Sequence, residues 1–179
     1  MLHFINTMNR NELFQCLESW LKQEGCAYEA DPDASAVTFT LGGSAGEWWS
    51  RIICEEEPLM LHVICRLPVR VPEEKLVEAA MLLHRINRSL RIGSFSVSSE
   101  ERTVTFRLAM PLRTEAPIES QISEAFHGAM GLFDERFALL CAFLCDDETT
   151  RRRLDELMPD VTAASSPGLN SRGTRPELN

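Results

Sequence analysis

The stretch 35-SAVTFTLGGSAGEWWSRIICEEEPLMLHVICRL-67 decides the fold of this chain. Residues 35–41 alternate between apolar and polar side chains, which predicts a strand with one buried face. Residues 47–55 and 59–67 predict two further strands that pair as a hairpin. The glycine-rich segment 42–46 and the acidic segment around Pro58 are typical of the connecting turns. This part of the chain therefore predicts an antiparallel sheet.

Helices are predicted on both sides of this stretch. Asn9 has the residue type of an N-cap, and Glu12 follows at capping-box spacing, so we expect a helix over residues 10–24. Pro72 is suited to open a second helix, which Gly93 closes. Two more strands lie around residues 95–97 and 104–110, and a last helix spans about 117–145. The predicted fold is α+β: an antiparallel sheet of five to six strands with helices on one face, in the order helix, three or four strands, helix, two strands, helix.

Length and charge limit the classes of protein to which the chain can belong. The 179 residues predict one α+β domain over residues 1–146, followed by a short helix at 147–158 and a disordered C-terminal tail at 159–179. The formal net charge of −9 argues against nucleic acid and against an acidic membrane surface, and fits a basic partner or no partner better. No apolar run approaches the length of a membrane span, and the first ten residues lack a signal-peptide pattern. We therefore expect a cytoplasmic location.

No motif for catalysis, metal binding or cofactor binding stands out. Six cysteines occur without a CxxC pair, so they are interpreted as reduced, mostly buried side chains. Cys141 and Cys145 are one helical turn apart, which leaves a metal site as a minor alternative. The four histidines share no motif, and the glycine-rich segment lacks the ending of a phosphate-binding loop. We expect no enzyme activity, no catalytic residues, no cofactor and no bound metal.

The second face of the predicted sheet is more informative. A face open to water should be polar, yet alternation assigns tryptophan, isoleucine and methionine to it, among arginine and threonine. Such an apolar cluster in a polar rim is typical of a contact surface. The candidate partner or dimer surface consists of Trp49, Arg51, Ile53, Met60, His62, Ile64 and Arg66. The alternative is that the chain's own C-terminal helix or tail covers this face.

Several short motifs together resemble a known family. They are Trp48 with Ile52, 67-LPVRVPEEK-75, 85-RINR-88, 93-GSF-95 and 104-VTFR-107. In this combination the chain resembles the YbjN family, described as bacterial sensory transduction regulators, over about residues 12–144. The resemblance implies a fold similar to that of the small dimeric chaperones of type III secretion, and therefore a homodimer.

Two residues within these motifs have structural interpretations. Gly93 would supply the backbone freedom needed between a helix end and a strand. Asn87 would use its amide to satisfy nearby backbone groups.

The predicted function is a non-enzymatic protein-binding module, adaptor- or chaperone-like, whose partner or client is unknown; a regulatory role in bacterial signalling is one form that this function could take. The mechanism would be sheet-face or edge-strand contact with an extended peptide. The alternative is a regulatory protein that senses a small ligand in a pocket between helices and sheet, with His84, Asn87 and Arg91 as the nearby polar groups.

Overall fold

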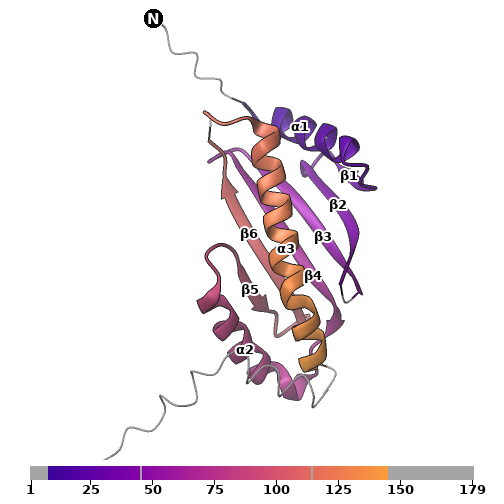
Figure 1. The fold of residues 1–179 in the computed structure, drawn as a ribbon, viewed down its shortest axis with the longest axis vertical. Helices are drawn as coiled ribbons and strands as arrows, with labels where there is room; N and C mark the ends of the chain where they lie inside the picture. Colours follow the sequence, from indigo (N-terminus) through magenta and orange to yellow (C-terminus); the bar gives the residue numbers. More distant parts are fainter. Residues whose placement is uncertain (1–7, 45, 114, 145–179) are drawn as a thin grey trace, which may run out of the picture.

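A six-stranded antiparallel sheet with helices on one face forms the molecule (Figure 1). The computed structural model describes residues 8–44, 46–113 and 115–144. The predicted α+β class is confirmed, with four strands between the first two α-helices. In chain order the elements are α1 (Arg10–Gln23), β1 (Glu29–Asp31), β2 (Ala36–Gly43), β3 (Gly46–Glu55), β4 (Met60–Arg70), a 3-10 turn η1 (Glu73–Lys75), α2 (Leu76–Ser89), β5 (Ser94–Val97), β6 (Thr103–Pro111) and α3 (Ile118–Leu144).

The strands lie in the order β1-β2-β3-β4-β6-β5, and every neighbouring pair is antiparallel. Strands β4 and β6 are neighbours although α2 and β5 separate them in sequence. The long strands β3 and β4 are central, while the short strands β1 and β5 form the edges. Short edge strands limit unwanted pairing with other chains.

Most predicted boundaries agree with the structure within about two residues, and two differ by more. Strand β4 does not end at Leu67 but continues to Arg70. Its register with β6 shifts between Arg66 and Arg70, so the strand accommodates Pro68 at an irregularity where a ladder hydrogen bond is not required. Pro72 does not open an α-helix directly, because η1 intervenes before α2 begins at Leu76.

Helix α1 begins with the predicted capping box. The Asn9 side chain accepts a hydrogen bond from the Glu12 backbone nitrogen at 3.0 Å, and the Glu12 carboxylate accepts one from the Asn9 backbone nitrogen at 2.9 Å. The apolar stripe of α1, which includes Leu13 and Leu17, is buried. This stripe packs α1 against α3 and β3.

Helix α3 lies along the sheet and supplies much of the core (Figure 1). The Trp48 ring of β3 lies 5.2 Å from the Phe133 ring and 5.4 Å from the Phe137 ring, measured between centroids. The turn between β2 and β3 is fixed to α3, because the backbone nitrogen and hydroxyl of Ser44 both donate to Asp134. Within the described ranges, neither α3 nor another helix is long and apolar enough to cross a membrane.

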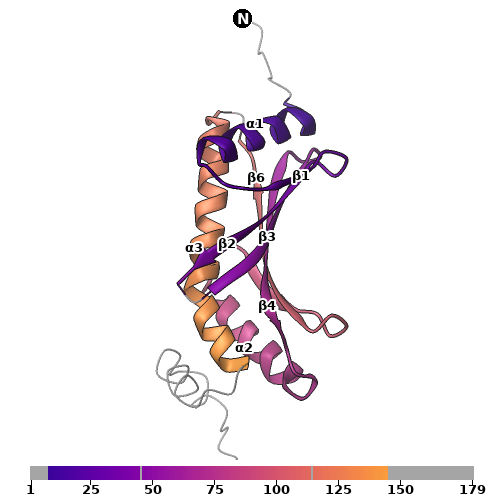
Figure 2. The same ribbon diagram turned by 90° about the vertical axis from the view of Figure 1, so that its right-hand side faces the viewer.

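The sheet has one covered and one open face. Figure 2 shows α3 against one side of the sheet, with α1 at one end of the molecule and α2 at the other. We call the opposite side the outer face; none of these three helices covers it. The two predicted C-terminal segments, the short helix at 147–158 and the disordered tail at 159–179, lie outside the described residues.

Candidate functional site: the outer face of the sheet

Burial alternates along β3 as the sequence pattern predicts. Trp48, Ser50, Ile52 and Cys54 are buried on the helix side, while Trp49, Arg51 and Ile53 are half-buried on the outer face. Because successive strand residues point to opposite sides, the two adjacent tryptophans have different environments. Trp48 belongs to the core, and Trp49 is available on the surface.

Strand pairing places all seven residues of the predicted contact surface on the outer face. Trp49 lies opposite Arg66. Arg51 lies opposite Ile64, and Ile53 opposite His62. Met60 lies opposite Glu55 at the β3–β4 turn. All seven side chains are half-buried.

Trp49 is held beside a cation. The guanidinium carbon of Arg66 lies 5.4 Å from the centroid of the Trp49 ring, a cation–π distance. The same guanidinium lies 3.3 Å from the carboxylate of Glu101 in the β5–β6 turn. Arg66 therefore orients the ring while keeping its own charge balanced.

Two further polar side chains on the outer face, Arg51 and His62, are paired with carboxylates. An Arg51 nitrogen lies 2.8 Å from a carboxylate oxygen of Asp31 on the edge strand β1. The His62 ring pairs with Glu55, its neighbour across the β3–β4 hairpin. Ion pairs at such exposed positions contribute little to stability, so their effect here is to fix side-chain positions around the apolar residues.

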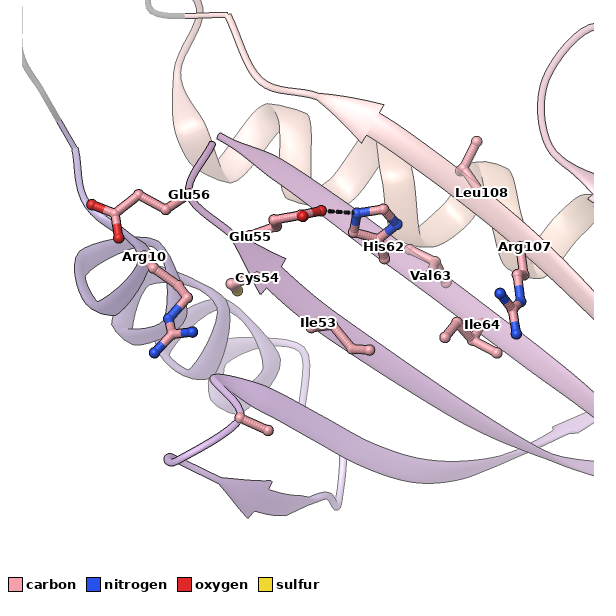
Figure 3. A pocket seen from close by; sticks show the side chains of 11 residues that line it. Arg10, Ile53, Cys54, Glu55, Glu56, His62, Val63, Ile64, Arg107 and Leu108 are labelled. Atoms are coloured by element: carbon pink, nitrogen blue, oxygen red, sulfur yellow. Dashed lines mark hydrogen bonds and ion pairs between the residues drawn. The ribbon is translucent and has the colours of Figure 1, made fainter. Parts of the chain in front are cut away.

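A groove of about 440 Å³ lies beside these pairs, between the outer face and the start of α1 (Figure 3). Ile53 and Ile64 give it an apolar floor, and His62 lies between them and the turn. Arg10 of α1 and Arg107 of β6 contribute guanidinium groups to its lining. Neither arginine has an ion pair within the part of the chain that the structure describes. The lining also carries the carboxylates of Glu55, which pairs with His62, and of Glu56, so the groove combines an apolar floor with charged groups of both signs.

Sequence reasoning did not include Arg10 and Arg107 in the site. Alternation along β6 does assign Arg107 to the outer face, and Ile64 lies opposite it. That signal was therefore available. No sequence signal brings Arg10 to this face, because its position depends on where α1 docks at the end of the sheet.

Asn87 and Gly93 lie on the helix-covered side, near β5. The Asn87 amide nitrogen donates to the Phe95 carbonyl at 2.9 Å, and its amide oxygen accepts from the Phe95 backbone nitrogen at 2.7 Å. Gly93 adopts a φ of +72°, and a Cβ atom there would lie 2.4 Å from Cζ of Phe106. Both residues fix the connection from α2 to β5.

The polar groups considered for a pocket between helices and sheet are engaged or exposed. The Asn87 amide is used by Phe95, while His84 and Arg91 are exposed.

Burial raises the pKa of the Cys54 and Cys65 thiols to about 12, so both stay protonated at neutral pH. Among the described residues, no group of three His, Cys, Asp or Glu side chains is placed to hold a metal ion.

Comparison with known proteins agrees with the architecture. The crystal structure titled "YbjN, a putative transcription regulator from E. coli" superposes with a TM-score of 0.56, at 11% sequence identity, and covers 73% of this chain and 92% of that chain. This likeness concerns the fold. No curated protein matches the sequence. The family model "YbjN: Putative bacterial sensory transduction regulator" matches residues 14–142, which is most of the chain. The chain therefore belongs to the YbjN family.

Proposed function

We propose that this protein is a cytoplasmic, non-enzymatic binding module, adaptor- or chaperone-like, that holds an extended segment of a partner protein across its outer face. The observation that carries the proposal is the apolar row on that face, formed by Trp49, Ile53, Met60 and Ile64 within a rim of paired charges. Aromatic, methionine and arginine side chains are the types enriched where proteins meet. A role in regulation would then follow from which partner is held.

The groove indicates the chemistry of the partner. An apolar side chain would fit against Ile53 and Ile64, and a neighbouring carboxylate would pair with Arg107, which lies on the side of the groove away from Glu55 and Glu56. The net charge of −9 favoured a basic partner, but the charge of a whole chain does not describe one face. The Arg107 guanidinium, which has no ion pair within the described residues, favours an acidic-apolar segment beside Ile64.

Selection from a library of short random peptides tests this proposal. The immobilised full chain should enrich peptides in which a large apolar residue is next to Asp or Glu. A buried aromatic anchor at an interface is often worth more than about 2 kcal/mol, so Trp49→Glu should weaken the enriched peptides at least about thirtyfold. Arg107→Glu should weaken them about tenfold, because it removes one carboxylate partner and adds repulsion.

Ala138→Glu is the matched control, since it adds the same negative charge at an exposed position of α3. It should leave peptide affinity unchanged. Absence of any enriched motif, or equal binding by wild type and Trp49→Glu, would overturn the proposal. Urea unfolding of each variant separates a lost contact from a lost fold.

A further inference from the structure

The sheet has one stretch of edge that its neighbouring strand does not cover. Strand β1 pairs only with residues 36–38 of β2, so residues 39–43 of β2 continue beyond the end of β1. On their other side the same residues pair with β3 along their whole length. Figure 1 shows this part of β2 at the margin of the sheet, beyond the end of β1. We call residues 39–43 the open edge.

The backbone groups of Thr40 and Gly42 point out of the open edge. The Cys54 backbone nitrogen donates to the Ser35 carbonyl at 2.9 Å, and these two residues face each other in the β2–β3 register. In an antiparallel ladder, hydrogen-bonded pairs alternate with pairs that are not bonded. The odd-numbered residues of β2 are therefore bonded to β3, whereas Thr40 and Gly42 direct their N–H and C=O groups away from it. Within the described ranges, no strand, loop or side chain is bonded to these outward groups.

Other parts of the sheet margin are protected. In β5 the outward N–H and C=O groups of Phe95 are both bonded to the Asn87 side chain. Strand β1 is three residues long and carries the carboxylates of Glu29 and Asp31. Short edge strands, charges and prolines limit pairing with other chains. The open edge contains no charged residue and no proline, so it has neither of these two protections.

We propose that an extended segment of a partner protein adds to the sheet as a further strand along the open edge. An extended segment presents N–H and C=O groups at every second residue, which matches the spacing of the free groups at Thr40 and Gly42. Thr40 lies opposite Trp49 of β3, so an added strand would be continuous with the outer face. The pairing rests on the proposed function, because the partner that it holds is the extended segment proposed above.

The two sides of β2 define the side chains of this segment. On the outer face Thr40 and Gly42 are small and exposed, so a large side chain of the added strand would reach over Thr40 toward Trp49. On the helix side Leu41 is half-buried against the core, and an apolar side chain opposite it would complete its cover. We therefore expect β-branched and aromatic residues, without proline, in the paired part of the segment.

The length of the open edge favours a short segment over a second copy of the chain. Stable interfaces between folded proteins involve about 20–30 residues a side. Pairing of residues 39–43 with the same residues of another copy would be far smaller. Backbone hydrogen bonds to a single extended segment do not need such an area, because the segment contributes both its backbone and its side chains.

Gly42→Pro tests the pairing, because proline removes the outward N–H without removing a hydrogen bond to β3. Peptides enriched from the random library by the wild type should bind this variant at least about tenfold more weakly. Loss of binding in Gly42→Pro with binding retained in Trp49→Glu would support the open edge and contradict the outer face. The reverse result would overturn the open edge and leave the proposed function standing. If no peptide is enriched, both are overturned.

Amide hydrogen exchange followed by NMR tests the same pairing without a substitution. In the free protein, the Thr40 and Gly42 amides should exchange at least about tenfold faster than the Phe39 and Leu41 amides. A saturating enriched peptide should slow exchange at Thr40 and Gly42 at least about tenfold. Unchanged exchange at these two amides with the peptide bound would overturn the inference. Protection that rises with protein concentration in the absence of peptide would also overturn it, because a second copy would then occupy the edge.

Discussion

Gly93 shows how one residue fixes the passage from α2 into β5. Its φ of +72° lies in the left-handed region, and an added Cβ would come within 2.4 Å and 2.7 Å of two ring carbons of Phe106. Phe106 is fully buried and cannot move aside easily. We expect Gly93→Ala to lower the free energy of unfolding by about 2–4 kcal/mol, measured by urea denaturation.

Gly128→Ala is the control for this prediction. Gly128 lies within α3, and a Cβ there would meet no atom within 4 Å. The same substitution should therefore stabilise the protein by about 0.5–1 kcal/mol, as alanine does in a helix interior. Equal effects at the two glycines would show that neither the backbone angle nor Phe106 matters at position 93.

Asn87 acts on the same connection through hydrogen bonds. Asn87→Ala leaves both backbone groups of Phe95 without their side-chain partner, and we expect a loss of about 2 kcal/mol of unfolding free energy. Asn87→Asp keeps the acceptor and loses the donor, so it should not restore stability. Faster hydrogen exchange at the Phe95 amide in the alanine variant would locate the effect. An alanine variant as stable as the wild type would contradict it.

At the scale of elements, the start of α1 gives a separate prediction. Asn9→Ala removes one half of the capping box and should cost about 1 kcal/mol of unfolding free energy. Asn9→Ser keeps an N-cap acceptor and should retain most of that stability. If both variants unfold at the wild-type urea concentration, the capping box does not contribute to the stability of the domain.

Elements with a strict period could be predicted from the sequence, and irregular ones could not. The period of two along residues 35–67 placed Trp48 inside and Trp49 outside, because a strand leaves no other arrangement once one face is buried. The predicted end of β4 was wrong, because Pro68 usually stops a strand and the register shift that accommodates it has no sequence signal. The groove was missed for a different reason. Alternation assigns Arg107 to the outer face, but Arg10 reaches the same lining only through the tertiary packing of α1.

At the scale of the whole molecule, the two buried thiols make the free energy of unfolding depend on pH in the alkaline range. Burial raises the pKa of Cys54 and Cys65 to about 12 in the native state, whereas an unfolded thiol ionises near its ordinary pKa of 9.0. Between these values the unfolded state binds fewer protons, so unfolding free energy falls as pH rises. The slope is at most about 1.4 kcal/mol per pH unit for each thiol.

Cys54→Ala should therefore flatten this dependence. Urea unfolding at about pH 8 and about pH 10.5 gives the change in unfolding free energy between these pH values for the wild type and for the variant. The other titrating groups contribute equally to both proteins, so their contribution cancels in the comparison. Wild type should lose more stability than the variant over this interval. Identical losses would show that the Cys54 thiol ionises in the native state as easily as in the unfolded chain.

The molecule separates two surfaces along its length. The groove on the outer face lies toward α1, and two exposed apolar side chains of α2, Val77 and Met81, lie at the other end of the molecule (Figure 1). This separation makes the two surfaces distinguishable by experiment.

Photo-crosslinking in living cells tests the binding face most directly, with p-benzoylphenylalanine placed at position 49 and, in a second variant, at position 81. A partner-holding outer face predicts that position 49 joins the chain to a different polypeptide, while position 81, exposed on α2, does not join the chain to that polypeptide. The contrary result is a position-49 variant that cross-links only to its own chain, only to a second copy, or to nothing. The outer face would then be covered by the protein itself or unused.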